Sequence, residues 1–219
     1  MTVQQRIGIA EDHLLLAQSV GFALRAEGLH VATADLTGED PFFDSLRPGP
    51  DLLVLLDLDL GEPLVDGVRL IPRLRAHAAR VLVVSGTTDR LRIAAAIEAG
   101  AIGYVAKHKA FDLLLKRVLQ AVRGEKVLDD CERHELLRAL RLSRQETERR
   151  MAPFQQLTPK ESLVLDELAH GKSVESIASE WVVSEATVRT QVRGVLTKLD
   201  VRSQLAAVAK ARAAGWRSS

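Results

Sequence analysis

Polar residues in the first half of the chain recur where short apolar runs end. The acidic pair Glu11 and Asp12 ends the first run, Asp57 ends the third, Ser85 the fourth and Lys107 the fifth. If the carboxylates converge, their like charges require a divalent cation, and a set of oxygen ligands suits Mg²⁺. A carboxylate nucleophile, a cation, a hydroxyl and an ammonium group together suit the uptake of a phosphoryl group.

The elements that must position these residues alternate along the chain. Strands are expected at residues 6–10, 30–34, 52–56, 81–84 and 103–106, because these runs are short and apolar. Helices are expected at residues 14–27, 66–78, 89–99 and 111–123, with a kink at Pro72 and a further short helix within 38–50. Five strand–helix units predict an α/β doubly wound five-stranded parallel sheet. Its first and third strands are neighbours, which brings the carboxylates to one edge.

The chain continues into a linker, so we place a first domain at residues 1–124 and a partly helical linker at 125–156. Residues 132–142 have the spacing of an amphipathic helix, with Leu136, Leu137 and Leu140 on one face. Residues 143–150 contain no apolar side chain, which leaves either a solvated helical extension or a flexible tether. Pro153 is expected to end any helix there.

The last part, residues 157–219, predicts a small all-α domain of four helices. Thr158 and Glu161 have the spacing of a capping box, and Ser184 and Ser203 can cap later helices. The segment around residues 173–193 has helix-turn-helix spacing. Residues 186–217 contain one acidic residue, Asp200, and seven basic ones: Arg189, Arg193, Lys198, Arg202, Lys210, Arg212 and Arg217. This excess of positive charge indicates that this end of the chain faces a polyanion.

Four residues of the predicted recognition helix are candidates for DNA contact. Arg189, Thr190 and Arg193 lie opposite the apolar stripe near the amino end, where such a helix meets base edges. Lys198, near the other end, suits a phosphate contact. The other interpretation is a helical bundle with exposed arginines.

Composition excludes some classes of protein. Hydrophobic residues make up 47% of the 219, so a core can form, whereas aromatic residues make up only 4%, which disfavours a base-stacking surface. A single cysteine excludes an internal disulfide, and no apolar run reaches the roughly 20 residues of a membrane span. We therefore expect a cytoplasmic protein without membrane contact and with no signal peptide.

Residues 7–123 resemble the receiver domain of bacterial two-component response regulators, a flavodoxin-like fold. The resemblance implies that Asp57 accepts a phosphoryl group from a sensor histidine kinase, and that Ser85 and Tyr104 are the switch hydroxyl and aromatic residues. It also implies that Lys107 is the buried lysine and that Glu11, Asp12, Asp57 and the backbone carbonyl of Asp59 ligate Mg²⁺.

Residues 157–203 resemble a LuxR-type DNA-binding domain, which places the chain in the NarL/FixJ class of response regulators. That class implies a transcription regulator that binds double-stranded promoter DNA, with a homodimer as its active form. The class also implies that the protein is not an enzyme, beyond catalysing its own phosphorylation and dephosphorylation.

Two departures from the receiver family keep alternative functions open, and one departure from the LuxR-type family means that either the turn before the recognition helix differs or stability is lower. Gly67 stands ten residues after Asp57, an apparent two-residue insertion, and His108 replaces the proline that often follows the lysine. Val182 stands where the turn usually carries glycine. One alternative is a regulator of the same architecture that ignores phosphorylation. A more distant one is an Asp-based phosphatase, because Asp57-Leu-Asp59 resembles the Asp-x-Asp of haloacid-dehalogenase-type enzymes.

Overall fold

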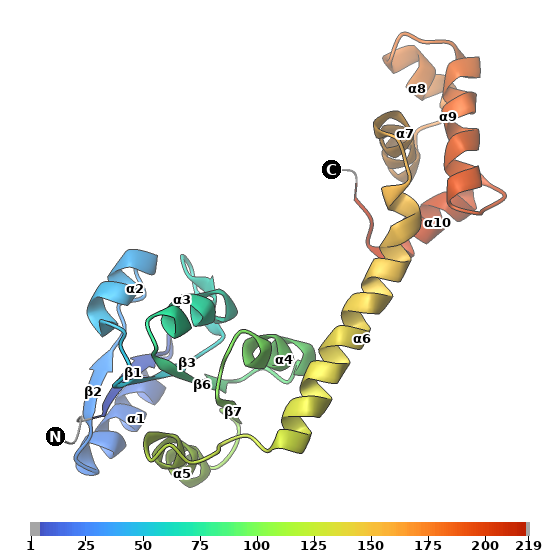
Figure 1. Cartoon of the computed structure of the whole chain (residues 1–219). Helices are drawn as coiled ribbons and strands as arrows, with labels where there is room; N and C mark the ends of the chain where they lie inside the picture. Colours follow the sequence, from blue (N-terminus) through green and yellow to red (C-terminus); the bar gives the residue numbers. More distant parts are fainter. Residues whose placement is uncertain (1–4, 218–219) are drawn as a thin grey trace. The chain divides into compact units, whose positions relative to one another are not determined.

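The computed structural model describes residues 5–217, and its contacts divide the chain into two compact units, residues 1–141 and 142–219. The first unit is built on a five-stranded parallel sheet in the order β2–β1–β3–β6–β7 (Figure 1). These strands are β1 (Arg6–Ala10), β2 (His30–Thr33), β3 (Leu52–Leu56), β6 (Arg80–Ser85) and β7 (Gly103–Ala106). The predicted doubly wound sheet is confirmed, and β1 pairs with β3 as expected.

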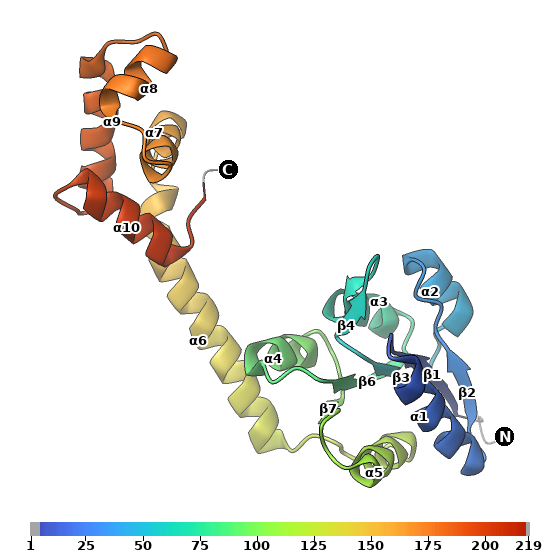
Figure 2. The same cartoon turned by 180° about the vertical axis from the view of Figure 1, so that it is seen from behind.

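Helices cover both faces of this sheet (Figures 1 and 2). One face packs against α2 (Glu39–Leu46), α3 (Ile71–Ala76) and α4 (Arg90–Glu98), and the other against α1 (Leu14–Ala26) and α5 (Phe111–Val122). The alternation of each strand explains this division. In β3, for example, Val54 and Leu56 join the first cluster while Leu53 and Leu55 join the second.

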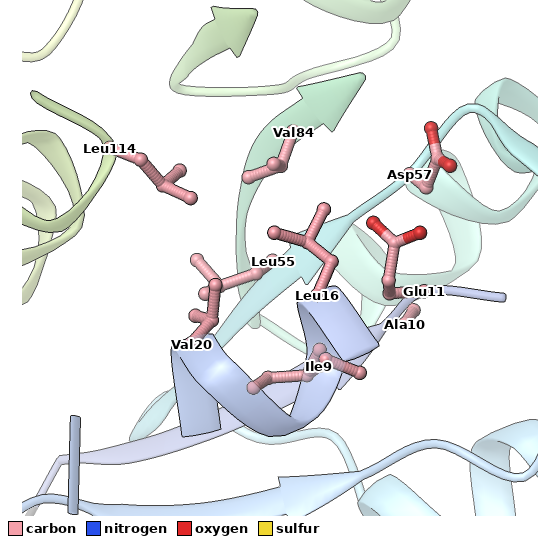
Figure 3. Close-up of a pocket in the computed structure, with 10 residues that line it drawn as sticks. Ile9, Ala10, Glu11, Leu16, Val20, Leu55, Asp57, Val84 and Leu114 are labelled. Atoms are coloured by element: carbon pink, nitrogen blue, oxygen red, sulfur yellow. The ribbon is translucent and has the colours of Figure 1, made fainter. Parts of the chain in front are cut away.

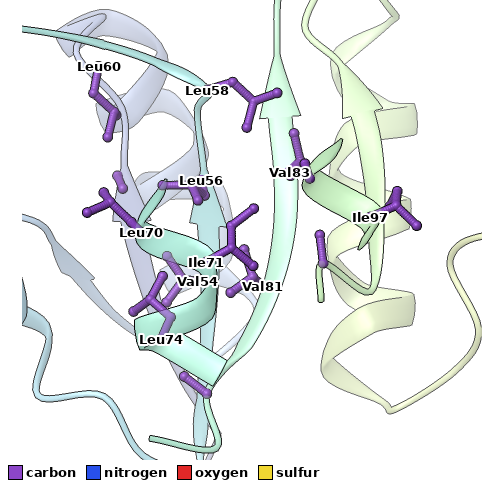
Figure 4. Close-up of a cluster of buried hydrophobic side chains, with 14 of the residues drawn as sticks. Val54, Leu56, Leu58, Leu60, Leu70, Ile71, Leu74, Val81, Val83 and Ile97 are labelled. Carbon is purple, nitrogen blue, oxygen red and sulfur yellow. The ribbon is translucent and has the colours of Figure 1, made fainter. Parts of the chain in front are cut away.

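The central strand β3 is buried along its whole length, as its unbroken apolar sequence predicts. Figure 4 shows Val54 and Leu56 packed among Leu70, Ile71 and Leu74 from the segment that follows. This core fixes the carboxyl end of β3, and the residue at that end is Asp57.

The apparent insertion after Asp57 forms a small antiparallel hairpin of β4 (Asp59–Gly61) and β5 (Val65–Asp66). A 3₁₀ helix, η1 (Gly67–Leu70), follows the hairpin, and the Asp66 side chain caps it by accepting from the Val68 N–H at 3.1 Å. The single helix predicted at residues 66–78 is therefore wrong at its start. Pro72 lies in the first turn of α3, where its missing N–H costs nothing, and does not kink a longer helix.

A single helix, α6 (Asp130–Gln155), spans the predicted linker. Leu136 and Leu140 are buried in the core of the first unit, whereas Phe154 is buried in the second. Residues 143–150 are thus a helical extension and not a flexible tether. The helix also continues two residues past Pro153, contrary to prediction, because Phe154 is held by stacking on Trp216 with ring centroids 5.6 Å apart.

The described part of the second unit, up to residue 217, contains four further helices, as predicted: α7 (Pro159–Ala169), α8 (Val174–Glu180), α9 (Glu185–Lys198) and α10 (Gln204–Ala214). Each begins at a capping residue whose hydroxyl accepts a backbone N–H, and at α7 the full capping box of Thr158 and Glu161 is present. Val182, in the turn between α8 and α9, has a φ of 54° and is 91% exposed. The turn is therefore retained, with valine in the left-handed conformation that favours glycine.

Over residues 5–217, no helix combines the length and apolar character that crossing a membrane requires.

Candidate phosphoryl site and DNA-reading helix

The ends of β1 and β3 bring two predicted carboxylates together. In the parallel register Ala10 pairs with Leu56, and the Asp57 N–H donates to the Ala10 carbonyl at 2.8 Å. Asp57 and Glu11 therefore emerge side by side, and both are buried, at 2% and 8% exposure. Figure 3 shows their carboxylates adjacent above apolar side chains. The small cavity beside them, about 10 Å³, has room for no more than a single water molecule.

Lys107 supplies the charge that compensates these buried carboxylates. Its backbone N–H donates to the Ser85 carbonyl at 2.9 Å, which extends the β6–β7 pairing to the edge of the sheet. Its Nζ then reaches Glu11 Oε1 at 2.6 Å and Asp57 Oδ2 at 2.5 Å. Burial acts to lower the pKa of Lys107, but the hydrogen bonds to Asp57 and Glu11 outweigh it and hold that pKa above its ordinary value. The ammonium thus stays charged beside Asp57.

The acidic residues of this edge can hold a divalent cation. Donor atoms of Glu11, Asp12, His13 and Asp57 all lie within 4.8 Å of one another. The carboxylate oxygens fit a hard cation such as Mg²⁺, which prefers oxygen ligands and is satisfied by few carboxylates. His13 was not predicted, and its place directly after the acidic pair was the only signal for it in the sequence. Its Nδ1 lies 2.7 Å from Asp12 and 3.0 Å from Glu11.

Ser85 and Tyr104 lie on β6 and β7, the two strands that follow β3 in the order of the sheet. Ser85 is 3% exposed at the end of β6, and its Oγ accepts the Thr87 N–H at 3.3 Å. Tyr104 is half-buried on β7 and donates its hydroxyl to Glu132 Oε1 in the first turn of α6 at 2.7 Å. This hydrogen bond, followed by burial, raises the pKa of Tyr104. The predicted switch tyrosine is therefore tied to the helix that leaves the first unit, a partner that sequence spacing does not reveal.

The carboxylate of Asp59 faces Arg92 and not the acidic cluster. The Arg92 guanidinium on α4 pairs with that carboxylate, donates to the Leu58 carbonyl at 2.6 Å and approaches Asp66 Oδ1 at 3.3 Å. The Asp59 N–H meanwhile donates to Asp57 Oδ1 at 3.2 Å. Arg92 thus fixes both strands of the inserted hairpin to α4, an arrangement that joins residues more than 25 positions apart and has no local signal.

Gly67 closes this loop directly against the backbone of Asp57 and Leu58. A Cβ at position 67 would lie 2.2 Å from the Asp57 carbonyl oxygen and 3.1 Å from the Leu58 Cα. The Gly67 N–H donates to the Leu58 carbonyl at 2.9 Å, which holds the two segments together. Glycine is needed here because the backbones approach too closely for any side chain.

The first and middle turns of α9 present polar side chains opposite its buried valines. Arg189, Thr190 and Arg193 are exposed, whereas Val188 and Val192 face the core. The Thr190 hydroxyl donates to the Ala186 carbonyl at 2.9 Å. The structure therefore places the three predicted base-reading residues together on one open face.

Lys198 has a different environment from those three residues. Its Nζ donates to Glu161 Oε2 at 2.6 Å, and the same oxygen accepts the Thr158 N–H at 2.7 Å. The Glu161 side chain is 9% exposed and that of Lys198 is 30% exposed. Gly194 leaves the room that Glu161 needs, since a Cβ there would lie 2.2 Å from its Oε1. Lys198 thus stabilises the packing of α9 on α7, and its predicted phosphate contact stays a prediction.

Comparison with known proteins finds two families along the chain. Residues 7–119 match the family described as response regulator receiver domain. Residues 155–211 match the family described as bacterial regulatory proteins, luxR family.

Curated relatives cover nearly the whole chain. The nitrate/nitrite response regulator protein NarL of Escherichia coli K12 is 33% identical over 202 residues, 91% of each chain. A homologue of that protein in Haemophilus influenzae is 29% identical over 205 residues, 92% of this chain and 93% of its own. Among solved structures, full-length FixJ from B. japonicum is 25% identical, covers 98% of both chains and has a TM-score of 0.46.

Proposed function

Because the chain belongs to the bacterial response regulators that join a receiver domain to a LuxR-type DNA-binding domain, we propose that phosphorylation of Asp57 by a sensor histidine kinase switches its activity as a transcription regulator. The observation that carries this proposal is the ion-paired group of Asp57, Glu11 and Lys107. Two carboxylates and an ammonium are held within hydrogen-bond distance at the open edge of the sheet. Burying such charges is costly, and phosphoryl transfer gives a reason for the arrangement.

In the proposed reaction, one Asp57 carboxylate oxygen attacks the phosphorus of a phosphohistidine in line. The new P–O bond forms as the P–N bond breaks, and the imidazole of the kinase leaves. Lys107 holds the charge that develops on the phosphoryl oxygens. Mg²⁺ bound by Glu11, Asp12, Asp57 and the Asp59 backbone carbonyl would neutralise the rest of that charge.

We propose that Ser85 then turns toward the acyl phosphate and Tyr104 swings inward behind it. Tyr104 would leave Glu132 in doing so, because one hydroxyl cannot keep a partner on α6 while the ring moves toward β6. Loss of this hydrogen bond would release the first turn of α6, the covalent connection to the second unit.

The second unit would bind double-stranded promoter DNA with α9 in the major groove. Arg189 and Arg193 suit bidentate contact with guanine, and Thr190 suits contact with a thymine methyl group. Lys198 would reach a phosphate, for which it would have to leave Glu161. A homodimer formed on phosphorylation would read two half-sites about one helical turn apart.

The decisive experiment is mass spectrometry of the full-length protein after incubation with acetyl phosphate and Mg²⁺. The wild type and Asp59→Asn should gain one phosphoryl group, whereas Asp57→Asn should gain none. Asp59→Asn is the matched control because it removes a carboxylate two residues away that is not the acceptor. Absence of the adduct on the wild type, or its presence on Asp57→Asn, would overturn the assignment.

Two features favour the alternative of a regulator that ignores phosphorylation: the hairpin formed by the insertion, and His108 after the lysine. A beryllofluoride titration read by dimerisation separates the two regulators, because the phosphorylation-independent one would dimerise equally without the ligand. The phosphatase alternative requires Asp59 as general acid/base, but Arg92 pairs with that carboxylate. Turnover of a generic phosphoester by the purified protein would support it.

A further inference from the structure

Arg189, the first base-reading residue proposed on α9, is held by two carboxylates. Its Nη2 donates to Glu175 Oε1 on α8 and to Glu185 Oε2 on α9, both at 3.0 Å. The Glu185 contact spans one turn of the same helix, a common surface pair. The Glu175 contact instead joins two helices across the turn, so it fixes where the guanidinium lies on the surface. All three side chains are about half-exposed, at 53% for Arg189, 57% for Glu175 and 50% for Glu185, so the cluster is open to solvent.

These two contacts limit how the Arg189 guanidinium can bind a guanine base. A bidentate contact with guanine uses a pair of adjacent N–H groups, either Nη1 with Nη2 or Nε with Nη2. Both pairs need one hydrogen of Nη2, which carries two. Because Nη2 donates to both Glu175 and Glu185, Arg189 cannot make a bidentate contact with guanine until one of these two hydrogen bonds breaks. The other glutamate can stay in place and keep the side chain oriented.

The net charge of this cluster also disfavours contact between Arg189 and the DNA backbone. One guanidinium and two carboxylates give this small cluster a net charge of −1, which repels DNA phosphates. A single phosphate oxygen offers a poor replacement for the released carboxylate, whereas a guanine edge offers two acceptors in the right plane. The pairing therefore favours guanine over non-specific backbone contact.

We propose that Glu175 is a specificity-determining residue, which orients Arg189 and makes its release from the carboxylates depend on a guanine edge. The inference deepens the proposed function, since it rests on α9 reading base pairs. Glu175 itself makes no contact with a base in this scheme and is a positioning residue that acts through Arg189.

The test uses the full-length protein with acetyl phosphate and Mg²⁺, and the DNA site that the wild type selects from a random-sequence pool. Affinities are measured for that site and for versions in which each G·C pair is replaced in turn. Glu175→Gln should raise affinity for the replaced sites more than for the selected site. The ratio between the selected site and the site altered at the base pair read by Arg189 should fall by about two- to fivefold, the range expected for one exposed ion pair.

Glu180→Gln is the matched control, because it removes the same charge from the same helix but from a residue that pairs with Lys172 at 2.6 Å. It should leave the ratio unchanged. In an Arg189→Ala background, Glu175→Gln should also leave the ratio unchanged, because a positioning residue has no effect without the residue that it positions.

Equal gains in affinity for all sites with Glu175→Gln, at an unchanged ratio, would overturn the inference, because simple relief of charge repulsion predicts that result. A fall in the ratio that persists in the Arg189→Ala background would also overturn it. If the wild type selects no sequence at all, both the proposed sequence-specific DNA binding and this inference are overturned. That outcome is distinguishable because it appears before any variant is compared.

Discussion

Replacing Val182 by glycine should stabilise the second unit. Val182 lies in the turn before α9 with a φ of 54°, a conformation in which the Cβ of an L-residue crowds the following carbonyl. Its side chain is 91% exposed and so contributes little burial in return. The valine thus carries a backbone cost without a packing gain.

The expected gain follows from two opposing contributions. The left-handed conformation costs an L-residue about 1–2 kcal/mol. Glycine recovers that cost but loses about 0.5–1 kcal/mol through the greater freedom of the unfolded chain. The net increase in the free energy of unfolding should be about 0.5–1 kcal/mol, which raises the Tm of a domain of this size by about 2–8 °C.

Tryptophan fluorescence of the full-length protein isolates this transition. The chain has two tryptophans, Trp181 and Trp216, and both lie in the second unit, so the signal reports its unfolding and not that of the receiver domain. Val183→Gly is the matched control, because this neighbouring valine is 41% exposed and is not among the described residues with positive φ. Val183→Gly should lower the midpoint of the thermal unfolding transition of the second unit. The reasoning is refuted if Val182→Gly unfolds at or below the wild-type midpoint, or if both variants shift it in the same direction.

Three other perturbations test the site and its supports. Gly67→Ala should slow phosphorylation by acetyl phosphate by about ten- to a hundredfold, because its Cβ would lie 2.2 Å from the acceptor's carbonyl oxygen and must displace that backbone. Lys198→Ala should lower the free energy of unfolding of the second unit by about 1–3 kcal/mol, since it leaves the buried Glu161 carboxylate unpaired. Burial acts to raise the pKa of Glu161, but its bonds to Lys198 and the Thr158 cap outweigh it and depress that pKa, so this stabilisation holds above the ordinary value of 4.5 and is lost as pH falls through the depressed one. Glu132→Ala should lower the pKa of Tyr104, the chain's single tyrosine, toward its ordinary value of 10.0 in an absorbance titration, because alanine removes the hydrogen-bond acceptor.

Each of these expectations has a contrary result. Unchanged phosphorylation kinetics in Gly67→Ala would mean that the loop relaxes without moving the acceptor. A Lys198→Ala variant as stable as the wild type, with the same acid sensitivity in fluorescence-monitored unfolding, would mean that the pair with Glu161 contributes nothing. An unshifted tyrosine titration in Glu132→Ala would mean that Tyr104 has no such partner in solution.

Local patterns in the sequence were enough to predict most of the elements and the edge of the sheet where the candidate site lies. The apolar run of β3 placed Asp57 at a strand end, and Thr158 with Glu161 marked the start of α7, because strand burial and helix capping depend on residues close in the chain. Parallel packing of strands then brought Asp57, Glu11 and Lys107 together without further information. The pairing of the first and third strands and the four helices of the second unit followed from the same reasoning.

Only the tertiary structure decided which charges meet across the fold. The pairs of Arg92 with Asp59, Tyr104 with Glu132 and Lys198 with Glu161 join positions 28 to 37 residues apart, and no periodicity encodes them. The course of α6 past Pro153 also depended on packing, since a buried Phe154 outweighed the loss of one backbone hydrogen bond. Residue types along the chain limit what a site can do, but side-chain partners are set by the distances that folding creates.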